Sequence, residues 1–302
     1  MSDAQHGGLP PWINPAQQHP IQWRDKDIVI AVPPKSGTTW TMNIVHQLLV
    51  GGDAAFFDIY AEVPWIEFVT RPGMPVEELL ARLENMPASR PRAFKSHSGP
   101  SDVSYAPPGE GKDVRYVVVM RNPEEALVSM KTFLEQHSEA WLALWQMPAE
   151  ALSWPDFATF YAQMVATSGM HRGLFAFLNA WWPLRNQANV LFMHFSDMVR
   201  DHEGAVRRVA DFLGVTPDAA QWPAILEYAG FPWMKQHATK FDSLSSEVPP
   251  LKPGAMVRKG KAGVSHEDGM TAEIAQEVRH IGEQMCADKN ALRWFYQGGA
   301  LS

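Results

Sequence analysis

Three short runs of almost uninterrupted apolar residues divide the chain, and each is followed by a polar turn and then by a helical pattern. The runs cover residues 27–31, 114–120 and 189–195. Strands that are buried on both faces of a parallel sheet give such continuous runs. A fourth, shorter strand is expected at residues 92–95. The alternation of strands and helices predicts an α/β fold with a parallel sheet flanked by helices.

Segments with apolar residues at helical spacing connect and follow these strands. Asn122 suits the N-cap position and Pro123 the first helical position, so one helix begins there. Glycines and prolines mark most of the other helix ends. The expected helices cover residues 41–50, 75–83, 123 onward, much of 138–188, 196–214, 217–230 and 271–287.

Two segments lack this periodicity. Residues 1–26 contain four prolines, and we interpret them as an extended N-terminal arm. Residues 53–75 carry aromatic residues and prolines and are expected to form a long loop or lid. The length of 302 residues permits one large domain or two small ones.

The overall charge argues against one class of partner. The formal net charge is -7, whereas sequence-independent nucleic-acid binding relies on Lys/Arg surfaces, so we expect no nucleic-acid partner. The single cysteine, Cys286, excludes an intrachain disulfide and a cysteine-based zinc site. The sequence has no signal-peptide pattern and no apolar run of bilayer length, so we expect a cytoplasmic protein without membrane insertion.

A lysine, a glycine and three hydroxyl residues gather in the turn after the first strand, at residues 32–40. Free N–H groups at a helix start point into such a turn and Lys35 adds a positive charge, so the turn is a candidate anion site. A Walker loop ends in Gly-Lys-Ser/Thr and its hydroxyl binds Mg²⁺. Here Thr38 follows Gly37, and the lysine comes two residues before the glycine. This favours a short anionic group held without a metal.

Three further motifs carry groups that bind or transfer anions. The fourth strand delivers Lys95 and His97 to its carboxyl end, where ligands bind in this fold class. Arg121 and Ser129 offer a guanidinium and a hydroxyl for a phosphate monoester. Residues 258–263 form a basic, glycine-containing loop. Taken singly, these are also compatible with a solvated histidine, a strand-end salt bridge and a solvated charged face.

Taken together and in this order, the motifs resemble those of the cytosolic-type sulfotransferases, in a bacterial-like form. The turn at 34–40 is similar to their phosphosulfate loop, and residues 95–97 to their Lys-Thr-His segment. Residues 121–129 and 258–260 are similar to their two 3′-phosphate motifs. The resemblance implies a single sulfotransferase domain over residues 1–302, with a three-layer, P-loop-like parallel sheet flanked by helices.

The resemblance also implies 3′-phosphoadenosine 5′-phosphosulfate (PAPS) as co-substrate, with no metal. His97 is expected to act as general base, while Lys35 and Lys95 offset the charge that builds on the bridging oxygen. The cofactor-binding residues that it implies are Lys35, Ser36, Gly37, Thr38, Thr39, Trp40, Arg121, Ser129, Phe195, Thr239, Phe241, Arg258, Lys259 and Gly260.

The sequence departs from the family pattern at several places. Phe195 stands in a tyrosine position, and Val264, Ser265 and His266 stand where Asp-Trp-Lys is usual. The family's C-terminal dimer motif has no match around Thr271. The oligomeric state and the effect on closure over the 3′-phosphate therefore stay open.

The expected partner is a small-molecule acceptor with a hydroxyl or amine. Aromatic residues in the expected pocket walls suggest an apolar or aromatic acceptor, whose identity stays open. These residues are Phe56, Phe57, Tyr60, Trp65, Trp141, Trp145, Phe231 and Trp233. Two alternative functions remain: a P-loop nucleotide-dependent kinase, and a non-catalytic binder of adenosine 3′,5′-bisphosphate.

Overall fold

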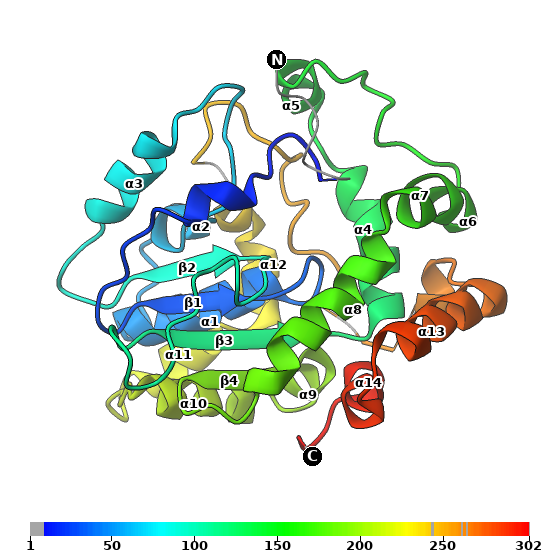
Figure 1. The fold of residues 1–302 in the computed structure, drawn as a ribbon. Helices are drawn as coiled ribbons and strands as arrows, with labels where there is room; N and C mark the ends of the chain where they lie inside the picture. Colours follow the sequence, from blue (N-terminus) through cyan, green and yellow to red (C-terminus); the bar gives the residue numbers. More distant parts are fainter. Residues whose placement is uncertain (1–8, 243–244, 261, 264, 302) are drawn as a thin grey trace.

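A four-stranded parallel sheet lies at the centre of the molecule (Figure 1). The structure is a computed structural model that describes residues 9–242, 245–260, 262–263 and 265–301. The strand order is β2-β1-β3-β4 and all neighbouring pairs are parallel. The strands are β1 Ile28–Ala31, β2 Ala93–Ser96, β3 Arg115–Met120 and β4 Val190–His194. The predicted α/β fold with a parallel sheet is therefore confirmed.

Helices cover both faces of this sheet (Figure 1). No helix in the described ranges is long and apolar enough to cross a membrane. The longer helices are α1 Thr38–Val50, α3 Val76–Glu84, α4 Pro123–Leu134, α8 Met170–Trp181, α10 His202–Leu213, α13 Ala272–Met285 and α14 Lys289–Gln297. The shorter ones are α2 Ile59–Glu62, α5 Glu139–Leu144, α6 Phe157–Phe160, α7 Ala166–Ser168, α9 Phe195–Arg200, α11 Trp222–Tyr228 and α12 Phe231–Gln236.

Side chains of the central strands alternate between two apolar cores. Val29 and Val118 pack into the core that α4 and α8 cover. Ile30 and Val117 face the opposite way, into the core that α1 and α10 cover. Because successive strand residues point to opposite faces and both faces are buried, every position must be apolar. This is the physical origin of the uninterrupted apolar runs.

Helix starts that depend on a local cap agree with the sequence pattern. The Asn122 side chain accepts the N–H of Glu124 at 2.9 Å, and Pro123 is the first residue of α4. The side chain of Asp201 accepts the N–H of Gly204 at 2.8 Å and starts α10. This second cap divides the segment after β4 into α9 and α10, so the prediction of one helix over 196–214 was wrong.

Two further helix boundaries differ from the predictions. The helix expected over 217–230 begins only at Trp222, and Gly230 is instead the N-cap of α12. Helix α13 ends at Met285, and the sequence interpretation missed α14. The carboxylate of Asp288 accepts the N–H groups of Asn290 and Ala291 and begins this last helix. A cap so close to the end of the preceding helix restarts the chain in a new direction.

The N-terminal arm is packed against the molecule. Within residues 9–26 a short 3₁₀ turn interrupts the extended chain at Pro15–Gln18. Trp12 is buried, and its carbonyl accepts the N–H of Val69 at 2.9 Å. The N–H of Asn14 donates to the carbonyl of Glu67 at 2.8 Å. The arm and the long loop at 53–75 thus hold each other over one end of the sheet.

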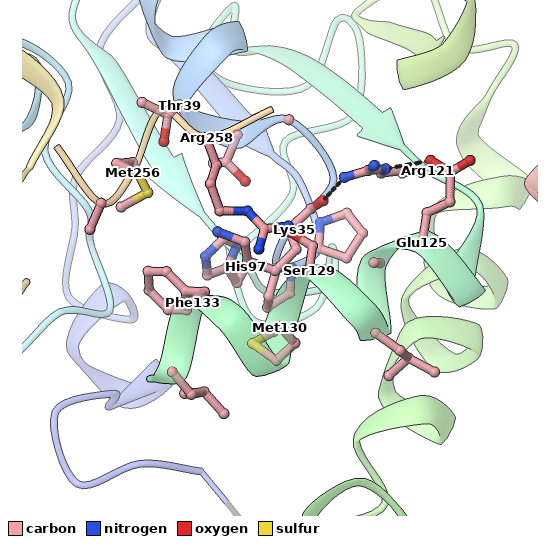
Figure 2. Close-up of a pocket in the computed structure, with 18 of the residues that line it drawn as sticks. Lys35, Thr39, His97, Arg121, Glu125, Ser129, Met130, Phe133, Met256 and Arg258 are labelled. Atoms are coloured by element: carbon pink, nitrogen blue, oxygen red, sulfur yellow. Dashed lines mark hydrogen bonds and ion pairs between the residues drawn. The ribbon is translucent and has the colours of Figure 1, made fainter. Parts of the chain in front are cut away.

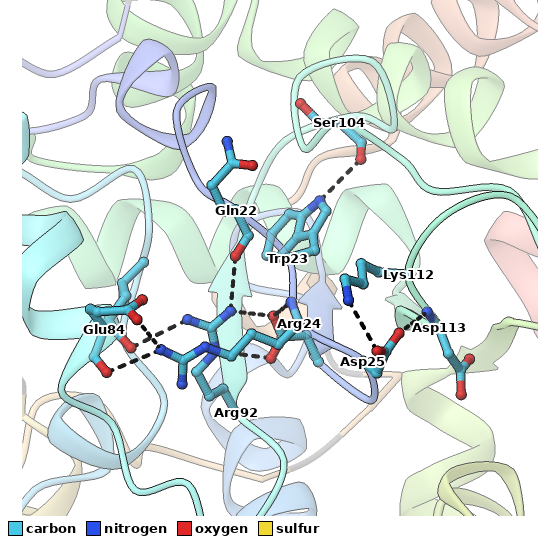
Figure 3. A network of polar contacts seen from close by, with 11 residues as sticks. Gln22, Trp23, Arg24, Asp25, Glu84, Arg92, Ser104, Lys112 and Asp113 are labelled. Atoms are coloured by element: carbon cyan, nitrogen blue, oxygen red, sulfur yellow. Dashed lines mark hydrogen bonds and ion pairs between the residues drawn. The ribbon is translucent and has the colours of Figure 1, made fainter.

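A buried ion pair joins the start of the sheet to the arm (Figure 3). Arg92 and Asp27 are 3% and 1% exposed, and Arg92 Nε donates to Asp27 Oδ1 at 2.9 Å while Nη2 contacts Oδ2. The guanidinium also donates to the carbonyls of Gln22 at 3.1 Å and Leu83 at 3.3 Å. One arginine therefore connects β1, β2, the arm and the end of α3.

Replacement of Arg92 by alanine is expected to lower the free energy of unfolding by about 3–5 kcal/mol, because it leaves the Asp27 carboxylate buried without a counter-charge. The exposed pair Lys112–Asp25, drawn in the same network, is the matched control (Figure 3). Lys112→Ala is expected to cost less than about 1 kcal/mol. Urea unfolding of both variants measures the difference, and equal costs would contradict the role given to Arg92.

Candidate active site

A cavity of about 1050 Å³ opens at the carboxyl ends of β1, β2 and β3. The turn after β1, the loop after β2 and the segment between β3 and α4 contribute Lys35, His97 and Arg121 to its wall. Parallel strands end at the same edge of a sheet, so these three motifs, far apart in sequence, meet there. Among the residues that the structure describes, no group of three His, Cys, Asp or Glu is placed to hold a metal ion.

The turn after β1 has the backbone geometry of an anion-binding loop. Lys35 and Gly37 have positive φ values of 64° and 96°. A Cβ on Gly37 would lie 2.7 Å from the ring of Phe195, so only glycine fits both the conformation and the space. The N–H groups of residues 37–40 make no hydrogen bond to any described group. They lie at the N-terminus of α1, where the helix dipole favours an anion.

Lys35 places an amino group in the cavity whose protonation state changes near neutral pH. Its Nζ lies 4.1 Å from the centre of the Phe133 ring. Desolvation, Arg258 and Arg121 lower the pKa of Lys35 to about 7. Figure 2 shows Lys35, His97 and Arg258 converging beside α4. An anionic ligand placed among these groups would favour the charged form of Lys35.

His97 is held in one tautomer. Its Nδ1 contacts the carbonyl oxygen of Val32, which can only accept, so Nδ1 carries the proton and Nε2 keeps its lone pair. The ring packs edge-on against Trp65 at 4.9 Å. Burial and the neighbouring Lys95 hold the pKa of His97 well below its usual range. The imidazole is thus neutral near pH 7 and can accept a proton at Nε2.

A buried glutamate organises the loop that carries His97. Glu67 is 1% exposed, and its Oε1 accepts hydrogen bonds from Ser96 Oγ and Ser98 Oγ, both at 2.6 Å. The same oxygen accepts the N–H of His97 at 2.8 Å. Lys95, also buried, lies 3.4 Å above the ring of Trp65. The sequence pattern did not identify Glu67, because it lies in a segment without periodicity and 30 positions before His97.

Burial changes the pKa values of this group in opposite directions. It raises the pKa of Glu67, against the effect of the serine hydroxyls. It lowers the pKa of Lys95 well below the usual value, although Glu67 opposes that shift. Lys95 and His97 therefore lie in a poorly solvated wall of the cavity, where electrostatic interactions are strong.

Arg121 and Ser129 both line the cavity, as expected for a phosphate site. Arg121 Nε forms an ion pair with Glu125 at 2.8 Å, and Nη1 donates to the carbonyl of Lys35 at 3.2 Å (Figure 2). The guanidinium lies 4.5 Å above the Phe195 ring. Glu125 also accepts the N–H of Gly263. This carboxylate, which sequence reasoning did not single out, fixes the direction of Arg121.

The basic loop also reaches the cavity. Arg258, Lys259 and Gly260 line it, and Asp268 balances the loop through contacts of 2.5 Å to Lys259 and 3.8 Å to Arg258. Gly260 has φ 61°, and a Cβ there would lie 2.4 Å from the Phe231 ring. Two residues of the basic loop and the segment after it, Lys261 and Val264, lie outside the described residues.

The aromatic part of the predicted cofactor set is arranged differently from expectation. Thr239 is exposed, Phe241 is fully buried in the core, and neither lines the cavity. Phe231, at the start of α12, lines it together with Trp40. Trp40 Nε1 donates to the carbonyl of Ala229 at 2.9 Å, next to this helix start. Packing explains why the predicted ring is not at the cavity: Phe241 is part of the core, whereas Phe231 lies in the cavity wall.

The other predicted cofactor-binding residues also differ in whether they line the cavity. Ser36 is buried beneath the loop, and its hydroxyl has no described partner. Phe195 lines the cavity as the platform under Gly37 and Arg121. The predicted residues that line the cavity are Lys35, Gly37, Thr38, Thr39, Trp40, Lys95, His97, Arg121, Ser129, Phe195, Arg258, Lys259 and Gly260.

The fold and this site define a class: an α/β protein of P-loop-like architecture with an anion loop, a second basic site and a tautomer-fixed histidine in one cavity. Comparison with known families makes the class specific. Residues 25–290 match the sulfotransferase domain family, and the chain belongs to it. It is a sulfotransferase, an enzyme that transfers sulfur-containing groups.

Individual relatives are distant but cover most of the chain. Rat sulfotransferase 1A1 is 26% identical over 256 residues, which cover 83% of this chain and 81% of the relative. Human sulfotransferase 2A1 is 25% identical over 269 residues, which cover 88% and 86%.

Solved structures show the same fold. Mouse sulfotransferase SULT7A1, crystallised with PAP, has a TM-score of 0.70 at 18% identity, with 94% of this chain and 93% of that chain covered. Retinol dehydratase in a complex with retinol and PAP has a TM-score of 0.68 at 21% identity, with 91% and 85% covered.

Proposed function

We propose that this chain transfers a sulfonate group from PAPS to a hydroxyl or amine of a small apolar or aromatic acceptor, and that residues 1–302 act as one domain. The observation that carries the proposal is the pairing, in one cavity, of His97 with a free Nε2 and the anion loop at Lys35. The first is a proton acceptor at neutral pH, and the second is a cradle for the donor's anionic groups.

Two neighbouring groups of residues in the cavity fit the two anionic groups of PAPS. The loop from Lys35 to Trp40 would hold the phosphosulfate, because the N–H groups of residues 37–40 donate to no described group and Gly37 leaves space. Arg121, Ser129 and the basic loop at 258–260 would hold the 3′-phosphate. The ribose that carries both groups would lie between them, and we place the adenine beside Trp40 and Phe231, instead of at the sequence-predicted Thr239 and Phe241.

The chemical step needs a base and a charge acceptor. His97 Nε2 would take the proton from the acceptor hydroxyl while its oxygen forms a bond to sulfur. The bond between sulfur and the bridging phosphate oxygen breaks, and that oxygen keeps the electron pair. Lys35 and Lys95 would stabilise the negative charge that develops there. The products are the sulfonated acceptor, adenosine 3′,5′-bisphosphate and a proton on His97.

The walls beyond the catalytic groups support an apolar acceptor. Of the aromatic residues proposed from the sequence, Tyr60, Trp65 and Phe231 line the cavity. Phe57 points to solvent, and Phe56, Trp141 and Trp233 are buried in the cores. Trp145 is partly buried against one of these cores and does not line the cavity. Leucine and methionine side chains from 134–174 complete the lining. Flexible thioethers adapt to ligands of varied shape.

Transfer of ³⁵S-labelled sulfonate from PAPS to a library of alcohols, phenols and amines tests the proposal. Calorimetry is the binding assay, with EDTA present for the bisphosphate and with Mg²⁺ in place of EDTA for ATP. We expect adenosine 3′,5′-bisphosphate to bind without a metal, and labelled products to form. Tight binding without transfer to any acceptor would favour a non-catalytic binder. Binding of ATP·Mg²⁺ in preference to the bisphosphate would favour a kinase.

Binding of adenosine 3′,5′-bisphosphate is expected to take up a proton above pH 7. The pKa of Lys35 is about 7 in the free protein, so the side chain is neutral above that pH, and an adjacent phosphate favours its charged form. The affinity should therefore fall as the pH rises from 7 to 9. Calorimetry in buffers of different ionisation enthalpy measures the uptake.

The variant Lys35→Met isolates this effect, because Lys95 and His97 remain to take up protons in both proteins. We expect smaller proton uptake in this variant, and an affinity that changes less with pH. Equal uptake by the two proteins would assign the proton to another group.

A further inference from the structure

His137 lies in the part of the cavity wall that the proposed reaction does not use. The residue is 6% exposed, yet it lines the cavity. Its ring packs between Trp12, at 5.1 Å, and Phe133, at 5.2 Å. An imidazole in such apolar surroundings needs hydrogen bonds for both of its nitrogens, because a buried polar atom without a partner is costly.

Only one of the two nitrogens has a partner in the described structure. Nδ1 lies 2.9 Å from the carbonyl oxygen of Leu134, which can only accept, so Nδ1 carries the proton. Nε2 is then a hydrogen-bond acceptor, and no described residue donates to it. Burial lowers the pKa of His137 to about 4, which keeps the ring neutral and this lone pair available at neutral pH.

Three segments fix His137 at this place. The arm contributes Trp12, α4 contributes Phe133, and an isolated β-bridge joins His137 to Leu251. The flanking residues clamp the same segment: the N–H of Ser138 donates to the carbonyl of Pro250 at 3.0 Å, and Gln136 accepts the N–H of Lys252 at 2.9 Å. A side chain held from three sides presents its free nitrogen in a defined position, as a specificity group should.

The position relative to the reaction centre is also set. Lys35 Nζ lies 4.1 Å from the centre of the Phe133 ring, and the Phe133 and His137 ring centres are 5.2 Å apart. His137 is therefore two contacts away from the proposed sulfonate site. His97 and His137 line the same cavity, so the separation of the two polar groups of an acceptor is the quantity that a test has to vary.

We propose that His137 selects acceptors which carry a second O–H or N–H group in addition to the hydroxyl that receives the sulfonate. The second group donates to Nε2 of His137, inside a lining that is otherwise mostly apolar. Acceptors of this class are diols, dihydroxyarenes and amino alcohols of small ring systems. The inference rests on the proposed function, since it assigns the acceptor side of the same cavity.

The test compares isomeric dihydroxynaphthalenes with the naphthols that lack one hydroxyl. The isomers are rigid and present a range of O···O separations. After correction for two equivalent hydroxyls, we expect kcat/KM for the best isomer to exceed that of its naphthol by about tenfold, the value of one buried hydrogen bond. A ratio near one for every isomer would overturn the proposal. A crystal structure of the acceptor complex in which a water molecule, and not the second hydroxyl, contacts Nε2 of His137 would also overturn it.

Two variants separate recognition from support of the fold. His137→Asn keeps a donor near the position of Nδ1 but has no atom at Nε2, whereas His137→Gln places an amide oxygen near Nε2 and gives up the bond to Leu134. We expect the preference for the second hydroxyl to vanish in His137→Asn and to persist in His137→Gln. Ser168→Ala is the matched control, because Ser168 also lines the cavity with an unpartnered hydroxyl.

Loss of the preference in Ser168→Ala, with retention in His137→Asn, would move the recognition to Ser168. Naphthalene fluorescence, measured with adenosine 3′,5′-bisphosphate present, reports acceptor binding independently of turnover. If no acceptor is sulfonated, the proposed function fails, but the affinity ratio still tests His137. Thermal unfolding of each variant identifies losses that come from misfolding.

Discussion

Replacement of His97 by alanine is expected to lower kcat by about 10²–10⁴-fold with PAPS and a good acceptor, the usual contribution of a general base. The structure gives the reason. The carbonyl of Val32 holds the proton on Nδ1, and Glu67 fixes the backbone of the loop, so Nε2 faces the cavity as a lone pair. An acceptor hydroxyl is a weak nucleophile until such a group removes its proton.

His97→Asn is the informative companion variant. An asparagine amide can still donate to the carbonyl of Val32, but it offers no base at the position of Nε2. We expect the same loss of kcat as in His97→Ala, with the affinity for adenosine 3′,5′-bisphosphate changed only a few-fold. Steady-state kinetics and calorimetry measure both quantities. Turnover within a few-fold of wild type in either variant would show that another group acts as the base.

The second large effect is expected at Lys35. Lys35→Met should lower kcat by about 10²–10³-fold, as removal of a group that stabilises developing charge does in other enzymes. The methionine keeps the length and the contact with Phe133 but removes the charge. Lys35→Arg keeps a charge at every pH, so it should retain more activity than Lys35→Met.

The pH profile of kcat/KM provides a second readout for Lys35. This quantity reports groups in the free enzyme, where the pKa of Lys35 is about 7. Because the charged form is the active one, kcat/KM should fall as the pH rises through 7. Because the pKa of His97 is lowered, kcat/KM should also fall at acid pH, where protonation of His97 removes the base. In Lys35→Met the fall above pH 7 should disappear, and an unchanged profile would contradict the assignment.

Much of the fold could be predicted because its signals are local. The apolar runs identified three of the four strands, the fourth was expected at residues 92–95, and the Asn122–Pro123 pair marked the start of α4. Helix boundaries failed where a cap restarted the chain, at Asp201 and Asp288. The pattern of apolar residues continues across such a cap, so periodicity alone does not show the change in direction.

The candidate site shows the same difference between residues that local sequence signals predict and residues that only packing places. Lys35, His97 and Arg121 follow strands in a parallel sheet, and the topology brings such residues to one edge. Phe241 and Phe231 are chemically equal in the sequence, and only packing decides that the first is in the core and the second in the cavity wall.

The sequence by itself determined the strands, the anion loop, the order of the basic motifs and thereby the class of chemistry, because each of these depends on residues that are close together along the chain. The tertiary structure alone decided which carboxylates accompany them. Glu67 reaches His97 across the sheet edge, and Asp268 meets the basic loop. It also decided which tautomers His97 and His137 adopt. Buried hydrogen bonds join residues that are distant in sequence, and their partners are fixed only when the chain folds.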